Sequence, residues 1–402
     1  MKKRIAIIGT VGLPANYGGF ETLAEHLVDN LSDSYDMDVY CSGKTYGKEH
    51  QVSSYKGANL IYLPLKANGI QSIIYDSLSI VHALVRSDVL LILGVAGAWL
   101  LPFVKLFTNK KIIISIDGIE WKRDKWNTIA KCYLFWAESL AVRFSHIDIS
   151  DNEAIQDYTA QRYQSLSRII EYGADHVMQV KPTAEYICDY PFLKGKYAVK
   201  VCRIEPENHV HTVLAAFSTM PDRKLVVIGN WNNSDYGVQL KEKYGDCSNI
   251  TILDPIYDQH SLDVIRGNAA LYVHGHSAGG TNPSLVEAMF LGLPIIANGV
   301  SYNRVTTENA ALYFMNSADL TNMLVSVNEE VLLQIGEKMG AIAQRRYTWG
   351  LIAQKYRLLV EEALEASGKK SVKGILASLS ASQLSKMGLS HLYNQEYFYS
   401  KR

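Results

Sequence analysis

Short apolar runs alternate with stretches of helical periodicity along almost the whole of this 402-residue chain. In the first half, the apolar runs are rich in Ile, Val, Leu and Tyr and end in polar turns, which is typical of strands buried in a parallel sheet. The strands predicted there are RIAII, MDVYC, NLIYL, VLLIL, KIIISI, HIDIS and RIIEY. Apolar residues at helical spacing predict helices over 20–31, 70–86, 126–144 and 152–163.

The periodicity fails from 175 to 196, where two prolines and mixed polarity predict a linker. The alternation of apolar runs and helical stretches then restarts. Helices are expected over 212–218, 236–244, 261–266 and 349–366, and a further helix is expected directly after the loop at 275–283. The strands predicted in this half are YAVKV, KLVVIG, NITIL, ALYVH, LPIIAN and ALYF. The pattern therefore predicts an α/β protein with two doubly wound domains.

The longest uncharged run, VLLILGVAGAWLLPFV at 89–104, is shorter than the ~20 residues of a spanning helix and contains two glycines and a proline. We expect a buried strand, a loop and a short helix there. The start, MKKRIAIIG, reads as a first strand because its apolar run is too short for a secretion signal. Residues 368–402 carry an apolar piece, GILASLSASQLSKMGL, which fits an amphipathic membrane-surface helix, but its Gly and Ser residues favour a solubilising tail.

Charge and cysteine content narrow the function classes. Forty basic and forty acidic residues cancel, so no overall field attracts nucleic acid or an anionic membrane. Five scattered cysteines without CxxC spacing favour reduced thiols in a cytoplasmic protein, and argue against a zinc site or a disulfide framework.

The segment HGHSAGGTNPSLVEAM, residues 274–289, joins a predicted strand to a predicted helix. Gly279 and Gly280 allow the backbone to approach a ligand, and Pro283 suits the first position of a helix. The amides at a helix start bind anions, so a phosphate-bearing ligand is expected, with Glu287 one turn further in to meet hydroxyl groups. The alternative is an ordinary strand-to-helix turn with a solvated Glu287.

The first strand leads into GTVGLPANYGGFE, which lacks the GxGxxG spacing, and the second strand does not end in an acidic residue. A nicotinamide cofactor is therefore disfavoured. The pair Gly18 and Gly19 stands just before a helix and either meets a phosphate or sugar or forms a plain tight turn. In the second half, Arg203 ends a strand with a bidentate donor set that suits a diphosphate, or else it pairs with Glu205 or Glu207.

Asp117 follows the strand KIIISI and is expected at the carboxyl edge of the sheet, where ligands of open α/β sheets bind. The cluster after it mixes cations with aromatic rings, which fits either a solvated helix start or a surface for a glycan or a lipid interface. Its members are Trp121, Lys122, Arg123, Lys125 and Trp126. No histidine pair has a third ligand at metal-binding spacing, and His276 is expected to line the cleft.

Four features, taken in order along the chain, resemble retaining glycosyltransferases of family 4. They are the Gly-Gly loop, Arg203, Gly229 after KLVVI and the PSLVEAM helix. The resemblance implies the GT-B architecture, in which two Rossmann-like domains face a central cleft and the C-terminal helix crosses back to domain one. It implies an acceptor-side domain at 1–180, a nucleotide-sugar domain at 196–348, a crossover helix at 349–366 and a tail at 367–402. Three motifs are similar to those of a bacterial branch of this family that contains rhamnosyltransferases of capsule and O-antigen assembly. They are GTVGLPANYGGFET, DGIEWKRDKW and GHSAGGTNPSLVEAM.

The resemblance implies that Glu287 holds the donor ribose, that Arg203 neutralises the leaving group and that Asp117 orients the acceptor or the sugar. The implied donor-binding residues are Gly18, Gly19, Gly229, His276, Gly279, Gly280, Thr281, Asn282, Pro283, Ser284 and Glu287. Trp121, Lys122, Arg123 and Trp126 would form an acceptor or membrane face. In two places the chain departs from the family: Gly279 replaces the first glutamate, and Asn208 replaces a lysine that would face the diphosphate.

The resulting hypothesis is a cytoplasmic transferase that uses neither a metal nor a cofactor. It would move a sugar, first of all L-rhamnose from dTDP-rhamnose, with retention onto a lipid-linked bacterial surface glycan. The expected partners are the donor and the acceptor, with peripheral contact at the inner face of the plasma membrane and no nucleic acid. Alternatives are another hexose donor, a nucleotide-sugar epimerase of the same fold, or a degenerate nucleotide-sugar-binding module.

Overall fold

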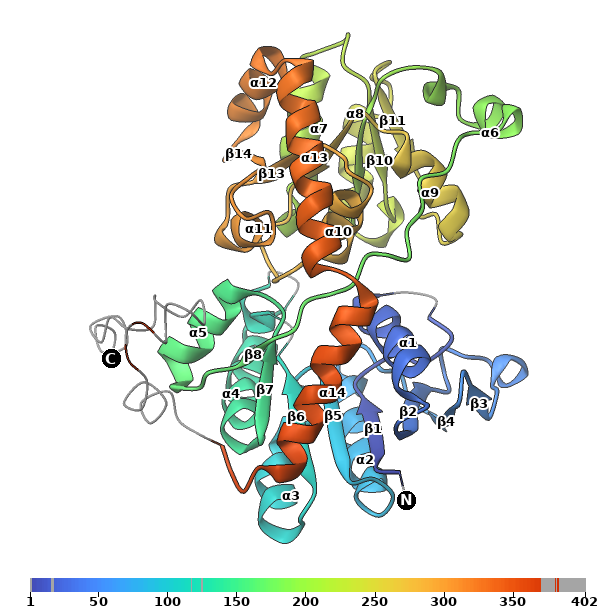
Figure 1. The fold of residues 1–402 in the computed structure, drawn as a ribbon. Coiled ribbons are helices and arrows are strands. Elements are labelled where there is room, and N and C mark those ends of the chain that lie inside the picture. Colours follow the sequence, from blue (N-terminus) through green and yellow to red (C-terminus); the bar gives the residue numbers. More distant parts are fainter. Residues whose placement is uncertain are drawn as a thin grey trace. The chain divides into compact units, whose positions relative to one another are not determined.

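The computed structural model describes residues 2–15, 18–116, 118–123, 126–369, 380 and 382. The chain divides into two compact units, one of Met1–Glu171 with Ile352–Arg402 and one of Tyr172–Leu351 (Figure 1). Asp117 and most of the tail lie outside the described residues, so the roles expected for them stay predictions. No helix in the described ranges combines the length and hydropathy needed to cross a bilayer.

The first unit contains an eight-stranded sheet in the order β3-β4-β2-β1-β5-β6-β7-β8. Its strands pair in parallel except for β3 with β4. Their bounds are β1 Arg4–Ile8, β2 Asp36–Ser42, β3 Ser54–Tyr55, β4 Ala58–Leu63, β5 Val89–Leu93, β6 Lys111–Ser115, β7 Ile147–Ser150 and β8 Arg168–Ile169. The last strand is shorter than predicted, since its pairing with β7 stops at Ile169, opposite the final β7 residue Ser150.

Helices cover both faces of this sheet. The connections from β4 to β5, β5 to β6 and β6 to β7 all run in one direction along the sheet, whereas β1 to β2 runs in the other. Since such crossovers are right-handed, α2, α3 and α4 cover one face and α1 covers the opposite face. The helical bounds are α1 Gly19–Leu31, η1 Lys48–His50, α2 Gln71–Leu84, η2 Ala98–Leu100, α3 Leu101–Phe107, η3 Glu120–Lys122, α4 Thr128–Phe144 and α5 Glu153–Tyr163.

The uncharged run at 89–104 forms β5, then η2 and the short helix α3, so the predicted strand, loop and helix are confirmed. The predicted C-terminal helix is α14, Trp349–Glu365, drawn in front of β5 and β6 in Figure 1. From Ile352 onward its residues belong to the first unit. There Lys355 pairs with Glu171, and Lys111 donates to the carbonyl oxygen of Ala366 at 2.6 Å.

The second unit has an all-parallel six-stranded sheet in the order β11-β10-β9-β12-β13-β14. Two doubly wound α/β sheets are therefore confirmed. The strands are β9 Ala198–Val201, β10 Leu225–Ile228, β11 Ile250–Leu253, β12 Leu271–His274, β13 Ile295–Asn298 and β14 Leu312–Phe314. The helices are α7 Val210–Ser218, α8 Asp235–Tyr244, α9 Gln259–Gly267, α10 Pro283–Phe290, α11 Ser301–Thr306, α12 Ser317–Ser326 and α13 Glu329–Arg346, with turns η5 Pro206–Asn208 and η6 Trp231–Asn233.

The predicted linker at 175–196 is not wholly irregular. It contains α6, Ala184–Asp189, which begins after Thr183, and η4, Pro191–Lys194. None of the six residues of α6 is buried, so no apolar stripe marked the helix in the sequence. The sequence pattern therefore did not predict this short helix, and the assignment of 175–196 as a linker between the domains stays a prediction.

The order of the second sheet places a topological switch point between β9 and β12. The chain leaves β9 toward β10 and β11, then returns to β12 on the other side of β9. Connections diverge at such a point and leave a crevice beyond the carboxyl ends of the two strands, where ligands of open α/β sheets bind. The loops that follow β9 and β12 are therefore the first place to look for a site.

Candidate functional site

The loop after β12 ends at the start of α10, as predicted from Pro283. Asn282 precedes the helix, and its side chain makes no capping hydrogen bond. The amides of Leu285 and Val286 both turn back to the carbonyl oxygen of Asn282, at 3.0 and 3.2 Å. An uncapped helix start carries partial positive charge, so this end of α10 is suited to an anion.

Hydrogen bonds fasten the loop after β12 to the loop after β9. Ser277 donates from its amide and its hydroxyl to the carbonyl oxygen of Glu207, at 2.9 and 3.0 Å. His209 Nε2 lies 3.1 Å from Ser277 Oγ. A Cβ atom at Gly275 would be 2.3 Å from the carbonyl oxygen of Asn208, so only glycine permits this approach. The two loops therefore form one preorganised wall of the crevice.

Arg203 follows β9 and is 44% exposed, and its guanidinium lies 3.5 Å from Glu205 Oε1. The ion pair that the sequence allowed as an alternative is thus present. Exposed ion pairs contribute only about 0–1 kcal/mol. Arg203 can therefore exchange Glu205 for a phosphate at little cost.

Asn208, which stands where the resembled family has a lysine, is buried in η5. Its Nδ2 donates to the carbonyl oxygen of Arg203 at 2.7 Å. Asn208 therefore braces the loop that carries Arg203 and does not supply a cation.

Glu287 has a partner on each carboxylate oxygen. Arg266, which is 0% exposed, pairs with Oε2, and His176 Nε2 lies 3.3 Å from Oε1. Burial alone would raise the pKa of Glu287, but Arg266 and His176 outweigh it and lower the pKa to about 2. Because a carboxylate has about four acceptor positions, this ionised side chain, 15% exposed, keeps capacity for ligand hydroxyls.

A chain of contacts holds the partners of Glu287. The indole Nε1 of Trp349 donates to His176 Nδ1 at 3.1 Å, which leaves Nε2 of a neutral His176 to carry the proton toward Glu287. Arg266 also lies 3.5 Å from Asp263, whose other oxygen accepts from the amide of Met178 at 3.0 Å. His176 fell in the predicted linker and Arg266 at the end of a predicted helix. Neither carried a signal of its own in the sequence.

A second cation lies beneath the loop after β12. Lys200, on β9, is 0% exposed, and its Nζ has no hydrogen-bond acceptor among the described residues. A Cβ atom at Gly275 would lie 2.8 Å from this Nζ. Burial lowers the pKa of Lys200, whereas Cys202 acts in the opposite direction. The one sequence signal for Lys200 is a charge inside the buried strand YAVKV.

Two histidines adjoin Lys200. His274 is 0% exposed, and burial together with Lys200 holds its pKa well below the ordinary value. Its ring stacks on His276 with centroids 4.3 Å apart. His274 is therefore neutral at neutral pH, and the stack fixes His276 in the loop.

The remaining residues predicted in this unit differ in their surroundings. Gly279 has φ +112°, a backbone conformation that side chains other than glycine rarely adopt, so a glutamate could not stand there without strain. Gly280 and Thr281 are buried in the same loop. Gly229 lets the end of β10 approach β9, since a Cβ atom there would be 2.4 Å from the carbonyl oxygen of Cys202.

In the first unit, carboxylates of α1 hold the loop after β1. Glu21 Oε1 accepts from the amide of Val11 at 2.6 Å, and Glu25 Oε2 accepts from that of Ala15 at 2.8 Å. Gly18 has φ +101° and a Cβ atom there would be 2.3 Å from Glu21 Oε2, so glycine is required before α1, which begins at Gly19. The predicted contact of Gly18 and Gly19 with a diphosphate stays a prediction.

The predicted aromatic and cationic face is largely engaged within the first unit. Trp121 Nε1 donates to Tyr158 at 3.1 Å, and Glu120 accepts from Trp126 and pairs with Arg123, each at 2.9 Å. Lys122 is exposed beside Trp121. The role of these residues toward an acceptor or a membrane stays a prediction. In the described ranges, no group of three His, Cys, Asp or Glu side chains is placed to hold a metal ion.

Comparison with known proteins connects this geometry with a class of enzymes. Residues 2–175 match a family described as a domain of unknown function, DUF1972, and residues 190–318 match the family described as glycosyl transferases group 1. No curated protein sequence matches the chain. The crevice between β9 and β12, Arg203 and the start of α10 all fall within the second match.

Solved structures share the fold. Sucrose-phosphate synthase from Thermosynechococcus elongatus is 16% identical, with a TM-score of 0.75 over 91% of this chain and 100% of that one. HepE from Anabaena, in complex with UDP, is 16% identical, with a TM-score of 0.66 over 90% and 100%. A glycosyltransferase from Rickettsia africae is 13% identical, with a TM-score of 0.69 over 91% and 100%.

These neighbours have the GT-B fold, so the predicted fold class is confirmed. Together with the group 1 domain, they support a GT-B glycosyltransferase. Membership of family 4 and of the rhamnosyltransferase branch stays a prediction.

Proposed function

We propose that this protein transfers a sugar with retention from a nucleoside diphosphate donor to a hydroxyl group of a lipid-linked bacterial glycan. One observation carries the proposal: the start of α10, where the Asn282 side chain makes no capping hydrogen bond, and an exposed arginine flank the switch-point crevice of the group 1 glycosyltransferase domain. Both supply positive charge where a diphosphate would develop negative charge. The resemblance to the rhamnosyltransferase branch makes L-rhamnose from dTDP-rhamnose the first donor to test.

In the proposed reaction, the bond between the anomeric carbon and the diphosphate oxygen breaks and the electron pair stays on that oxygen. Arg203 and the amides at Asn282, Ser284 and the rest of the α10 start stabilise the charge. The acceptor hydroxyl attacks from the same face, and the leaving oxygen takes its proton. Charge on the diphosphate is thus met by protein groups rather than by a metal ion.

Glu287 has a separate task in this proposal. Its two protein partners leave acceptor positions for the hydroxyls of the donor ribose. Gly279, Gly280 and Thr281 border the sugar, and Asp117 orients the acceptor or the sugar. Because position 279 is a glycine, no carboxylate side chain is available there to recognise the sugar. Shape and backbone contacts would select the sugar instead.

Binding of the correct donor should raise the melting temperature. A ligand at about a hundred times its Kd stabilises the folded state by about 2.7 kcal/mol, which corresponds to a rise of a few degrees for a chain of this size. A thermal-shift panel of nucleoside diphosphate sugars should therefore show a rise, with dTDP-rhamnose tested first. UDP-glucose belongs in the panel because the neighbour HepE was solved with UDP and glucose. If no nucleotide sugar and no free nucleoside diphosphate shifts the transition, the donor site is wrong.

We further propose that Lys200 supplies the cation that is missing at Asn208. Its buried ammonium lies under Gly275, and a charge in a low-dielectric interior acts over a longer range than one in water. Lys200→Met preserves the volume and removes the charge, so we expect nucleoside diphosphate affinity to fall about tenfold or more. Isothermal calorimetry with the nucleoside diphosphate and with the nucleoside alone measures this.

The control for Lys200→Met is Lys241→Met, which removes an exposed lysine from α8 of the same unit. The Lys241→Met protein should bind the nucleoside diphosphate with the affinity of the wild type. Because a buried charge without a partner disfavours folding, its removal in the Lys200 variant should not lower the melting temperature. Equal loss of affinity for the nucleoside and the nucleoside diphosphate would contradict an electrostatic role.

The rival functions separate in one assay. A nucleotide-sugar epimerase would isomerise the donor without any acceptor, so incubation of donor alone followed by chromatography detects it. A binding module would bind nucleotide and transfer to no acceptor glycan. The transferase predicts turnover only when both substrates are present.

A further inference from the structure

One face of the first unit exposes apolar side chains on successive helices. On α2 they recur at Ile74, Leu78 and Val81, the spacing of a single helical stripe, and all three are exposed. On α3, Leu106 and Phe107 are 74% and 75% exposed. By the handedness of the crossovers, α2, α3 and α4 lie on the same side of the sheet. We call the outward surface of α2, η2, α3 and α4 the apolar face.

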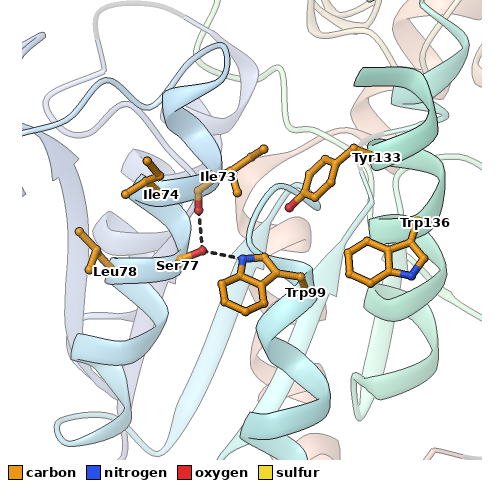
Figure 2. Close-up of a pocket in the computed structure, with 7 residues that line it drawn as sticks. All are labelled: Ile73, Ile74, Ser77, Leu78, Trp99, Tyr133 and Trp136. Atoms are coloured by element: carbon orange, nitrogen blue, oxygen red, sulfur yellow. Dashed lines mark hydrogen bonds between the residues drawn. The ribbon is translucent and has the colours of Figure 1, made fainter. Parts of the chain in front are cut away.

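The apolar face contains a pocket of about 450 Å³ between α2 and α4. Figure 2 shows Trp99 of η2 between Ile73, Ile74 and Leu78 on α2 and the rings of Tyr133 and Trp136 on α4. Elements α2 and α4 both pack against η2, so the surface is continuous.

The polar atoms of Trp99 and Tyr133 in this pocket are engaged within the protein. Trp99 Nε1 donates to Ser77 Oγ at 2.9 Å, and Tyr133 Oη donates to the carbonyl oxygen of Ala96 at 2.5 Å. Apart from the indole Nε1 of Trp136, hydrocarbon and ring surfaces line this pocket. The pocket is therefore suited to an apolar chain and offers little to a sugar or a nucleotide.

The charges of the apolar face have one sign. The acidic residues of its four elements, Asp76 and Glu138, are 3% and 1% exposed. Burial raises the pKa of Asp76 to about 8, so this side chain is largely protonated at neutral pH. Glu138 accepts hydrogen bonds from the hydroxyls of Tyr158 and Tyr163, each at 2.5 Å, and so faces into the unit. The other ionisable side chains of these elements are basic, apart from neutral cysteine and tyrosine: His82, Lys105, Lys131 and Arg143. No acidic side chain of α2, η2, α3 or α4 is therefore exposed on this surface.

We propose that the apolar face docks onto an anionic phospholipid bilayer, with exposed apolar side chains inserted at the interface and an acyl chain in the pocket beside Trp99. Apolar insertion combined with basic side chains is how monotopic proteins bind anionic lipid. Tryptophan rings favour the same interface. The proposal deepens the proposed function, on which it rests for its biological meaning, because it places the acceptor-side unit where a lipid-linked acceptor would lie.

A second copy of the chain is a poorer occupant of the apolar face. A twofold interface brings the same surface of both copies together, so the basic side chains of one would face those of the other. Bilayer phosphates instead complement these charges. The bilayer is therefore the occupant that both the apolar surface and the charge favour.

Flotation of the full chain with lipid vesicles tests the proposal in the absence of any nucleotide. We expect binding to vesicles of phosphatidylcholine and phosphatidylglycerol in equal parts, weaker binding to phosphatidylcholine alone, and a loss of binding as salt rises. The double variant Leu106→Gln with Phe107→Gln should bind the anionic vesicles about a hundredfold more weakly, since each side chain contributes about a decade when it leaves water. Both side chains are exposed, so the melting temperature should not change.

The matched control is Val325→Gln with Leu333→Gln in the second unit, whose side chains are 69% and 64% exposed. It should bind vesicles like the wild type. Wild-type protein that stays free of anionic vesicles, or a double variant that binds them equally, would overturn the proposal. A dimer seen by light scattering that the double variant abolishes, without vesicle binding, would assign the face to a second copy instead. The thermal-shift panel tests donor binding without lipid, and flotation tests bilayer binding without nucleotide. The proposed donor site and the proposed bilayer contact can therefore fail independently.

Discussion

Replacement of Arg203 by alanine is expected to reduce the turnover of sugar transfer about 100- to 1,000-fold, the usual cost of removing one preorganised donor from a developing charge. The side chain is 44% exposed and, among the described residues, its ion pair is with Glu205 at 3.5 Å, so folding should be unaffected. Initial rates at saturating donor, together with the melting temperature, distinguish a loss of catalysis from a loss of structure.

Two further variants sharpen the Arg203 experiment. Arg203→Lys keeps the positive charge but loses the planar bidentate geometry, so it should recover part of the lost rate. Arg345→Ala removes another exposed, ion-paired arginine of the second unit and should leave turnover unchanged. Wild-type rates in the purified Arg203→Ala protein would show that Arg203 does not stabilise the leaving group.

The second large effect is expected for Glu287→Gln. The substitution leaves Arg266, which is 0% exposed, without its charge partner, and breaking a buried pair in this way costs about 3–5 kcal/mol of unfolding free energy. Donor affinity should fall as well, because an amide accepts fewer hydrogen bonds from the ribose than a carboxylate. Denaturant unfolding and nucleotide calorimetry measure the two effects separately.

The pH dependence of the Glu287 effect has a definite sign. Folding lowers the pKa of Glu287 from 4.5 to about 2. The stability that the ionised form contributes is therefore fully present above about pH 4.5 and is lost as the pH falls toward 2. The difference in unfolding free energy between wild type and Glu287→Gln should shrink across that interval, and a difference that stays constant would contradict the ion-pair explanation.

A control for Glu287 is Glu308→Gln, which removes a carboxylate that pairs with Arg345 and Arg346 at a more exposed position. It should cost at most about 1 kcal/mol, as exposed pairs do. Unchanged nucleotide affinity in Glu287→Gln would remove the ribose assignment while leaving its structural role intact.

Much of the fold could be predicted because the buried strands of both sheets are short apolar runs with glycine or polar residues at their ends. β5 and β12 were predicted within a residue for this reason. The short elements α6 and β3 were missed, since neither buries a stripe that repetition could reveal. Local pattern shows an element only when that element has a buried face.

The site was predictable in part. Pro283 and the paired glycines marked the start of α10, and Arg203 was visible as a cation at a strand end. Lys200, Arg266 and His176 were not identified, because each acts through partners far away in the sequence. The contact between His176 and Glu287 exists only once the segment after the first sheet is folded against α10.

By itself, the sequence determined which segments are strands and helices, that they form two doubly wound sheets, and which loops could meet an anion. Those features depend on local periodicity and turn chemistry, which neighbouring residues encode. The tertiary structure alone decided that Glu287 is held ionised between Arg266 and His176, and that Lys200 lies beneath Gly275. It also decided that the stripe on α2 is exposed, because an apolar stripe looks the same in a sequence whether or not another element covers it.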